Sequence, residues 1–175
     1  KNLTAQYKES GCSFKVSLGK VYFSPRLSAE RLRIAKQVRD GESVGVFFAG
    51  AGPYCIVIGK HSKAERIVGF EWNPAAVKDF EENARRNKMH GSIEIAAGDV
   101  RKNSENFKGR FDRIVMPSPS NAIEYFKIAL DCCKKKAIIN FYCFSETANP
   151  FKKPIEEVKK IAEKCKRKVK VLSKK

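Results

Sequence analysis

Residues 44–74 read VGVFFAGAGPYCIVIGKHSKAERIVGFEWNP, and this stretch decides the fold. An apolar run at 44–48 leads into a turn of small residues, a short helix-length apolar segment, and a second apolar run that ends in Glu71. The order predicts strand, glycine turn, helix and strand, with Pro53 suited to the first helical position. Glycines let the backbone approach a ligand closely, and an acid at the second strand's end can accept hydrogen bonds from ribose hydroxyls. We interpret the stretch as a nucleotide-binding βαβ unit.

The glycine turn also bears on which nucleotide binds. A dinucleotide fingerprint, Gly-x-Gly-x-x-Gly/Ala, would need Gly or Ala at the position of Cys55. S-adenosylmethionine carries an adenosine but no pyrophosphate, so it needs only the turn and the ribose acid. The stretch therefore favours a methyl-donor site over a dinucleotide site. An ordinary αβ turn, with glycines kept for packing, is the alternative without a ligand.

The composition bounds the class of protein. A chain of 175 residues with 42% hydrophobic residues fits one domain with a sizeable core. No apolar run reaches the ~20 residues of a membrane span. No signal-peptide pattern opens the chain, which we expect to be a piece of a longer protein. The six cysteines form no Cys-x-x-Cys pair and the two histidines lie far apart, which argues against a metal site. Thiols in apolar runs favour a reducing compartment, so we expect a cytoplasmic protein. We also expect the protein to be a monomer.

The charge favours a polyanionic partner. Lys and Arg number 36 against 19 Asp and Glu, a net charge of +17. Residues 134–175 hold 14 basic and 4 acidic residues, so +10 of this excess lies toward the C-terminus. A net charge this high favours nucleic acid as the partner in a cytosolic protein. The alternative is a lysine-rich solvated surface with no such partner.

Hydrophobic periodicity predicts strands that alternate with helices along the rest of the chain. The expected strands cover residues 13–18, 21–23, 44–48, 67–71, 93–97, 111–116, 137–144 and 168–172. The expected helices cover residues 24–40, 53–59, 73–88, 122–135 and 154–166. The first two strands would form a hairpin, so we expect a truncated hairpin subdomain at 1–23 and the methyl-donor-binding domain at 24–175. The alternation predicts an α/β fold with a mostly parallel sheet, helices on both faces, and a ligand at the carboxyl ends of the strands.

Four motifs, each at or just after an expected strand, occur in the order of a known family. They are VYFSPRLSAER at 21–31, FAGAGP at 48–53, EWNP at 71–74 and RIVMPSP at 113–119. With them the chain resembles, from about residue 11 to 172, the catalytic region of the archaeal and eukaryotic tRNA (guanine-N1)-methyltransferases that modify position 37. The first two motifs are specific only as a pair. The resemblance implies a class I methyltransferase (Rossmann-like) fold, S-adenosyl-L-methionine as cofactor and tRNA as substrate.

The resemblance also implies which residues bind. Glu71 would hold the ribose and Trp72 would lie beside the adenine, with Asp99 and Val100 at the adenine edge. The full set of implied cofactor-binding residues is Arg31, Phe48, Ala49, Gly50, Gly52, Pro53, Glu71, Trp72, Asp99, Val100, Met116 and Pro117. The RNA contacts that we expect are Tyr22, Arg26 and Pro119.

Glu30 matches the carboxylate that this family uses as general base. Methylating N1 of guanine displaces a sulfonium leaving group in line, and a nearby carboxylate can take the N1 proton. An arginine can stabilise charge that develops at O6, and Arg26 is the candidate. On the residues alone, Glu30 is better explained as an acid favoured by a helix dipole, and Arg26 as a phosphate contact or surface residue.

The chain departs from the family at two places. Val46 stands where many relatives have an acid, and Pro117 stands where many have the Asn of an Asn-Leu-Pro-like string. A proline offers no side-chain donor to guanine, so positioning there would rest on backbone or shape. Two alternatives stay open: a wybutosine-pathway aminocarboxypropyl transferase on the same scaffold, and an RNA-binding module with reduced catalysis.

Overall fold

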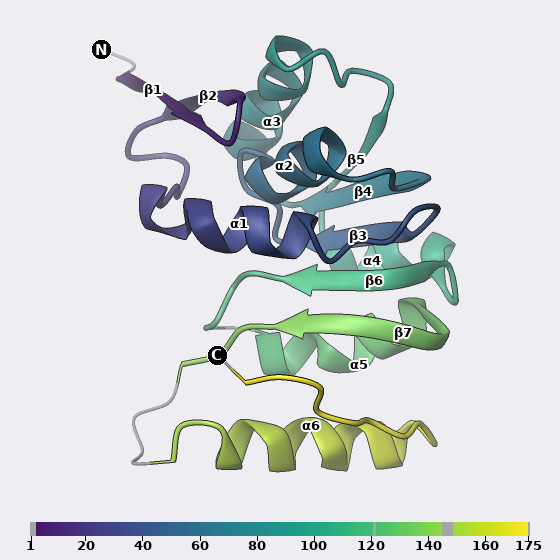
Figure 1. Ribbon diagram of the computed structural model, residues 1–175. Helices are drawn as coiled ribbons and strands as arrows, with labels where there is room; N and C mark the ends of the chain where they lie inside the picture. Colours follow the sequence, from purple (N-terminus) through teal and green to yellow (C-terminus); the bar gives the residue numbers. More distant parts are fainter. Residues whose placement is uncertain (1–2, 121, 145–148, 175) are drawn as a thin grey trace.

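A five-stranded parallel sheet forms the centre of the protein (Figure 1). The computed structural model describes residues 3–120, 122–144 and 149–174. The strands are β3 Ser43–Phe47, β4 Arg66–Glu71, β5 Ile93–Ala97, β6 Phe111–Met116 and β7 Cys133–Phe141. Their order is β5-β4-β3-β6-β7, so the chain leaves β3 toward one side and later returns to its other side. Ligands of parallel α/β sheets bind at such a reversal, outside the carboxyl ends of the strands.

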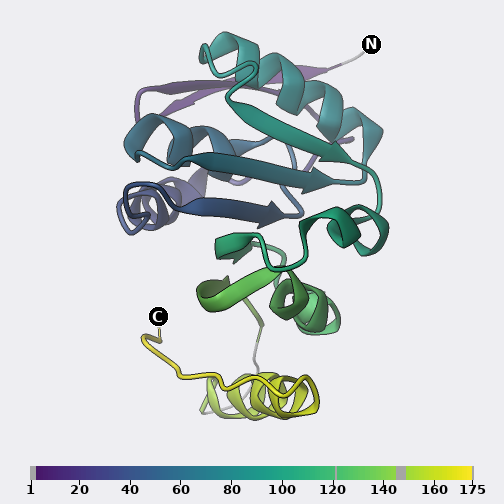
Figure 2. The ribbon, with the colours of Figure 1, turned by 90° about the vertical axis from the view of Figure 1, so that its right-hand side faces the viewer.

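Helices cover both faces of this sheet, which confirms the predicted α/β architecture (Figures 1 and 2). The helices on one face are α1 Ser28–Ala35, α2 Pro53–His61 and α3 Pro74–Arg86. The elements on the other face are α4 Val100–Asn103, the 3-10 helix η2 Ser104–Phe107, α5 Ala122–Cys132 and α6 Lys152–Lys164. A further 3-10 helix, η1 Pro25–Leu27, leads into α1.

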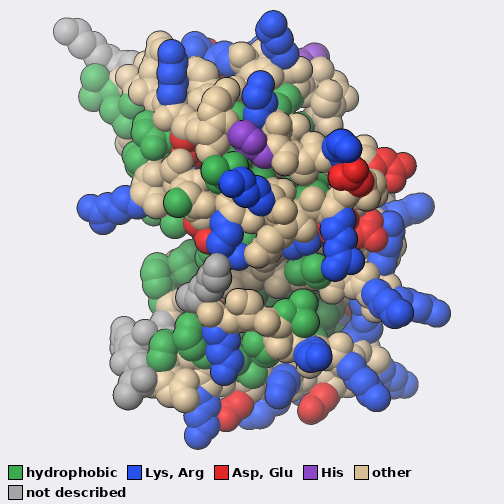
Figure 3. Space-filling view, viewed as in Figure 1, with side chains coloured by type: hydrophobic (Ala, Val, Ile, Leu, Met, Phe, Trp, Pro, Cys, Tyr) green, Lys and Arg blue, Asp and Glu red, His purple; other side chains and the backbone are tan. Residues whose placement is uncertain are grey.

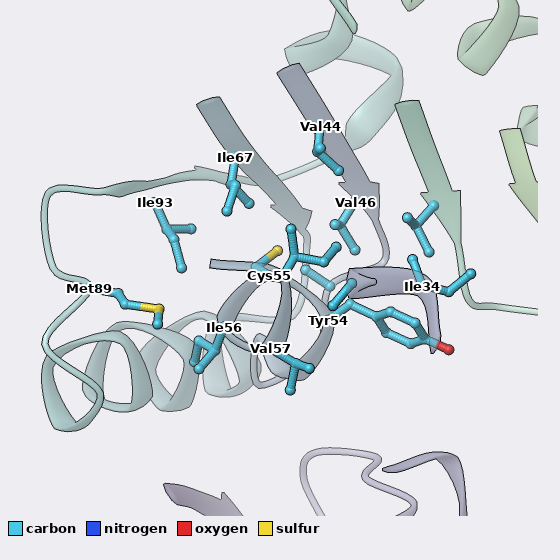
Figure 4. Packing of buried hydrophobic residues seen from close by; sticks show 14 of the residues in the cluster. Ile34, Val44, Val46, Tyr54, Cys55, Ile56, Val57, Ile67, Met89 and Ile93 are labelled. Carbon is cyan, nitrogen blue, oxygen red and sulfur yellow. The ribbon is translucent and has the colours of Figure 1, made fainter. Parts of the chain in front are cut away.

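Side chains that alternate along each strand supply two cores. Val44 and Val46 of β3 pack with α1 and α2 in the first core, whereas Phe47 packs with α5 and α6 in the second. Figure 4 shows the first core, where the residues of α2 meet Ile67 of β4 and Met89 beyond α3. Because the central strands are covered on both faces, they consist of nearly continuous apolar runs. These runs made them predictable.

The N-terminal hairpin differs from the predicted one. It pairs β1 Thr4–Glu9 with β2 Cys12–Ser17 in antiparallel register, from Thr4 opposite Ser17 to Glu9 opposite Cys12. Ser10 and Gly11 form the two-residue turn with φ of 48° and 68°, values typical of a type I′ hairpin turn. The predicted partner, residues 21–23, is not a strand; Val21 and Phe23 pack as irregular chain instead. The domain division between residues 23 and 24 stays a prediction.

The outer edge of β2 is bound by α3 through a ladder of side chains. The side-chain amide of Asn87 accepts from the N–H of Ser13 and donates to the carbonyl of Ser13. Asn83 makes the same two hydrogen bonds with Lys15. One turn earlier, Asp79 accepts from both the N–H and the hydroxyl of Ser17. The i, i+4, i+8 spacing of a helix thus matches every second residue of a strand. This ladder satisfies the edge of the hairpin and fixes it on the main domain.

The predicted last strand, residues 168–172, is also wrong. Residues 168–174 are irregular and pair with no described strand. The side chain of Arg167 donates to the carbonyls of Leu130, Cys133 and Lys134, and so anchors the start of this segment beside β7. The largest differences in bounds are at α1, which ends at Ala35 rather than near residue 40, and at β7, which runs over Cys133–Phe141 rather than 137–144. The helix α5 accordingly ends at Cys132 rather than at residue 135.

Candidate active site

The turn between β3 and α2 has a backbone that requires glycine. Phe48, Gly50 and Gly52 have φ of 57°, 57° and 83°, all in the left-handed region. A Cβ on Gly52 would lie 2.0 Å from Cδ2 of Phe80, so any side chain there would force the buried Phe80 ring to shift. Pro53 follows at the first position of α2, as predicted. The turn therefore places Phe48 and Gly50, which are half-buried, at the carboxyl end of the central strand.

Glu71 joins this turn to the end of the neighbouring strand. Glu71 is 7% exposed, and its carboxylate accepts from the N–H of Gly50 at 2.7 Å and from the N–H of Asn73 at 2.9 Å. The backbone hydrogen bonds between β3 and β4 continue beside it, because the Ala49 N–H donates to the carbonyl oxygen of Phe70 at 2.9 Å. The two bonds to Glu71 use about half of the lone pairs of a carboxylate. The acid that we expected to bind ribose is thus held against the glycine turn.

Two exposed aromatic side chains border the turn. Trp72 is 75% exposed and directly follows Glu71, and Tyr22 is 83% exposed. The segment that carries Tyr22 is tied to α3, because the Asn73 amide donates to Lys20 O at 2.8 Å. A Cβ on Gly50 would lie 3.8 Å from the Tyr22 carbonyl oxygen, so this segment passes over the turn. Both aromatics are available to a planar ligand.

The residues after β5 and β6 complete the same edge. Asp99 caps α4 by accepting from Arg101 N–H at 2.9 Å, and the Arg101 guanidinium lowers the pKa of this carboxyl below its usual value. The side chains of Val100 and Met116 lie in the second core, so any contact of theirs with a ligand at this edge would be through the backbone. Pro117 follows Met116 and is half-buried.

Glu30 lies in a second cluster, built from three segments. Its carboxylate accepts two hydrogen bonds from Arg33, both at 2.6 Å, and one from the Tyr142 hydroxyl just beyond β7. The Tyr142 ring meets the Tyr54 ring of α2 edge-on, with centroids 6.3 Å apart. Since Tyr54 directly follows Pro53, this contact links Glu30 to the glycine turn. Tyr142, Tyr54 and Arg33 were not among the site residues predicted from the sequence.

Arg31 binds mainly to the hairpin, and its guanidinium also lies 6.0 Å from the centroid of the Tyr54 ring, next to the glycine turn. It is 2% exposed, donates twice to Glu9 of the hairpin at 2.5 Å, and donates to Ser24 O at 3.1 Å. Its guanidinium also lies 5.1 Å from the centroid of Phe23. These contacts make Arg31 a link between the hairpin and α1, and its expected contact with the cofactor stays a prediction. Arg26 is exposed on η1, and Pro119 is half-buried.

Other features of the described residues lie away from this edge. Two pockets, of about 370 and 340 Å³, lie on either side of β5, and no residue of the glycine turn lines them. Among residues 3–120, 122–144 and 149–174, no three His, Cys, Asp or Glu side chains are grouped to hold a metal. None of the helices within those ranges is long and apolar enough to cross a membrane.

The positive charge is spread over the surface in view. Figure 3 shows Lys and Arg side chains over both the upper part of the molecule and the lower part that holds α6. The exposed lysines of α6 are Lys152, Lys153, Lys159, Lys160 and Lys164. Three more, Lys134, Lys135 and Lys136, are exposed at the start of β7.

Residues 5–172 match the family model of the TRM5/TYW2 methyltransferase domain. The chain belongs to this family. A tRNA (guanine(37)-N(1))-methyltransferase, Trm5b of Pyrococcus abyssi, is 37% identical over 168 residues, which are 96% of this chain and 49% of that protein. The resemblance on the four motifs is thus confirmed at the level of the family.

Solved structures of the TRM5/TYW2 family have the same fold. The crystal structure of Trm5b from Pyrococcus abyssi superposes with a TM-score of 0.88 and 34% identity, over 99% of this chain and 51% of that one. Methanocaldococcus jannaschii TYW2, in complex with AdoMet, has a TM-score of 0.86 and 28% identity, over 94% and 74%. These neighbours confirm the class I methyltransferase fold. The chain spans about half the length of the Trm5b that it matches.

Proposed function

We propose that the intact protein transfers a methyl group from S-adenosylmethionine to N1 of guanine at position 37 of tRNA, in the cytoplasm. The observation that carries the proposal is the meeting of the four motifs at one edge of the sheet. Glu71 joins the second and third motifs through Gly50, Asn73 ties the start of the first to α3, and β6 brings the fourth beside β3. The name of the Pyrococcus abyssi relative supports the choice of reaction and substrate.

The residues at this edge fit the proposed cofactor. Phe48, Ala49, Gly50, Gly52 and Pro53 would line its methionine side, where the absence of a Cβ at Gly50 would let the backbone approach it closely. Glu71 would accept from the ribose hydroxyls, since it is an acid at the second strand's end. Trp72 would cover one face of the adenine, and Asp99 with the backbone of Val100 would border its edge. When bound, the cofactor supplies an electrophilic methyl group on a sulfonium.

Glu30 is proposed to take the N1 proton as the new N–C bond forms. The S–C bond breaks in the same displacement, so the sulfonium charge is lost as a neutral thioether leaves. A positioned carboxylate assists such a step by about 10²–10⁴-fold. Arg26 would stabilise the negative charge that develops at O6 when N1 is deprotonated. Tyr22 and Pro119 would contact the RNA around the target base.

Product analysis tests this proposal directly. The intact protein is incubated with S-adenosylmethionine and a tRNA transcript that carries guanine at position 37, and the digested RNA is analysed by mass spectrometry. We expect one added methyl group, mapped to N1 of guanine 37. A transcript with adenine at this position serves as the matched control and should gain no methyl group. An unmodified guanine-37 transcript would overturn the proposal.

The same experiment separates the two alternatives. TYW2 shares the family model and the fold, so the scaffold can also serve transfer of the aminocarboxypropyl group. That product would be heavier and would require a wybutosine precursor in place of guanine. An RNA-binding module without catalysis would retain the tRNA and leave its mass unchanged. Calorimetric titration with S-adenosylmethionine would then show no binding.

A further inference from the structure

We propose that Tyr142 is a positioning residue for Glu30: its hydroxyl holds the carboxylate in the orientation in which it takes the proton. This inference rests on the proposed function and adds a residue outside all four motifs. Tyr142 lies 112 residues from Glu30 in sequence and follows β7, the outermost strand on its side of the sheet. The contact between them is a direct hydrogen bond from phenol to carboxylate.

The geometry fixes the Glu30 carboxylate from two directions. Arg33, one turn along α1, binds both oxygens and so defines the plane of the carboxylate. Tyr142 approaches from a different element and donates to Oε1. A pair within one helix would move with that helix. The bond to Tyr142 instead ties Glu30 to the carboxyl edge of the sheet, where the proposed substrate would sit.

The Tyr142 ring is itself held in place. It packs against the first core and meets Tyr54 edge-on at 6.3 Å, while Tyr54 is 3% exposed at the start of α2. Figure 4 shows the Tyr54 hydroxyl pointing away from the aliphatic side chains of α2. This hydroxyl is buried and has no hydrogen-bond partner among the described residues. A ring packed in this way loses little further entropy when it holds Glu30.

The environment of Tyr142 keeps its phenol protonated, so that it donates a hydrogen bond to Glu30. Burial, with the neighbouring Tyr54 and Glu30, raises the pKa of the Tyr142 phenol well above its usual value. Among residues 3–120, 122–144 and 149–174, the charged and titratable groups that face Glu30 include Arg33 on its own helix and Tyr142 beyond β7, with Tyr54 of α2 behind them. Arg31, the next residue, is turned toward Glu9. A neutral phenol that donates to a carboxylate stabilises its charged form.

A Tyr142→Phe variant of the full-length protein tests the inference. It keeps the packed ring and removes only the hydroxyl. Tyr7→Phe is the matched control, because the ring of Tyr7 in β1 also packs edge-on, against Phe23, and Tyr7 lies outside the proposed site. Cofactor affinity is measured for both and should match the parent. Urea unfolding should remain a single cooperative transition in both, with a lower midpoint in Tyr142→Phe because it loses a hydrogen bond to a charged group.

Two readouts separate positioning from packing. The first is the titration of the Glu30 carboxyl by ¹³C NMR, with its signal identified by its loss in Glu30→Gln. Without the hydroxyl, its midpoint should rise by about one to two pH units, the counterpart of a lost hydrogen bond to a charged group. The second is the single-turnover rate of methyl transfer as a function of pH. Its plateau should fall about ten-fold, because a less constrained carboxylate is less often aligned.

Each outcome decides a different claim. A parent that transfers no methyl group to guanine-37 tRNA overturns the proposed function and this inference with it. A parent that transfers methyl, with a Tyr142→Phe variant whose Glu30 midpoint and plateau are parental, overturns the inference alone. A raised midpoint and lowered plateau in Tyr142→Phe, with parental values in Tyr7→Phe, support it.

Discussion

The carboxylate of Glu71, at the end of β4, accepts a hydrogen bond at 2.7 Å from the N–H of Gly50, in the turn after β3. Its other oxygen accepts from the N–H of Asn73, where α3 begins. One buried charge thus orients three segments that come from two strands and a helix. Glu71 therefore fixes the shape of the glycine turn through contacts within the protein itself.

Replacing Glu71 by Ala should weaken S-adenosylmethionine binding ten-fold or more. Hydrogen bonds to a charged acceptor are worth about 1.5–3 kcal/mol, and every 1.4 kcal/mol is a factor of about ten in affinity. Glu94→Ala is the control, since Glu94 is an exposed acid paired with Arg66 on the edge strand β5. Calorimetry measures both variants. Parental affinity in Glu71→Ala would show that the ribose assignment is wrong.

Gly52→Ala should destabilise the protein much more than Gly41→Ala. Both glycines have left-handed φ, of 83° and 77°, so both changes carry the cost of about 1–2 kcal/mol for a Cβ in this region. Only at Gly52 would the new Cβ overlap the Phe80 ring, whereas nothing lies within 4 Å at Gly41. The overlap should add about 1–3 kcal/mol of overpacking. Urea unfolding measures the difference, and equal losses would contradict the close packing of Phe80 on the turn.

Asn83→Ala should loosen the hairpin from α3. The Asn83 side chain is fully buried and bonds to the N–H and carbonyl of Lys15 and to the carbonyl of Ala51. Its removal leaves these groups unsatisfied, at about 1–3 kcal/mol for a buried polar group. Glu81→Ala, an exposed site on the same helix, should change little. Hydrogen exchange at the Lys15 amide reports the loss locally, and unchanged protection there would argue against the ladder.

The 175-residue chain by itself should bind tRNA weakly, with an affinity that depends on salt. The motivation is the +10 charge of residues 134–175. Lysine contacts with phosphates release counterions, so affinity falls steeply as salt rises. Filter binding across a salt series, with an uncharged peptide-nucleic-acid analogue as control ligand, measures the slope. An affinity independent of salt would be evidence against electrostatic binding.

The central sheet was predictable because its strands are apolar runs bounded by turn residues. The observed bounds of β5 and β6 match the predicted ranges 93–97 and 111–116. The strand β1 was not predicted, because TAQYKE offers only Ala5 and Tyr7 as alternating apolar positions, a weak signal in a mostly polar segment. The Ser10-Gly11 turn was a signal that could have found it, because both residues suit a tight hairpin turn. Residues 168–172 alternate as a strand would, yet the pattern alone supplies no neighbour to pair with.

The site was predictable only where it follows from the order of the strands. Adjacent parallel strands bring Gly50 and Glu71 to one edge, so their proximity follows from the βαβ pattern. The environments of Glu30 and Arg31 do not follow from it. Adjacent on one helix, they point to Tyr142 and to Glu9, which lie far away in sequence. Such contacts depend on how α1 packs against the rest of the fold, and local periodicity carries no information about this.

The central claim is that Glu30 serves as the base in methyl transfer to guanine 37. Glu30→Gln keeps the size and polarity of the side chain but cannot accept the N1 proton. In the full-length protein, the single-turnover rate with guanine-37 tRNA should fall by roughly 10²–10⁴-fold. S-adenosylmethionine affinity should stay parental, because Glu71 and the glycine turn are untouched. Glu105→Gln, at an exposed acid on η2, is the control.

Single-turnover methylation of guanine-37 tRNA by the parent and Glu30→Gln is therefore the decisive measurement. The account predicts a rate that rises with pH in the parent until Glu30 is ionised, and a lower, flatter profile in the variant. If Glu30 serves only the helix dipole, the variant loses about 0.3–1 kcal/mol of stability and keeps its turnover. Parental single-turnover rates in Glu30→Gln would contradict the account.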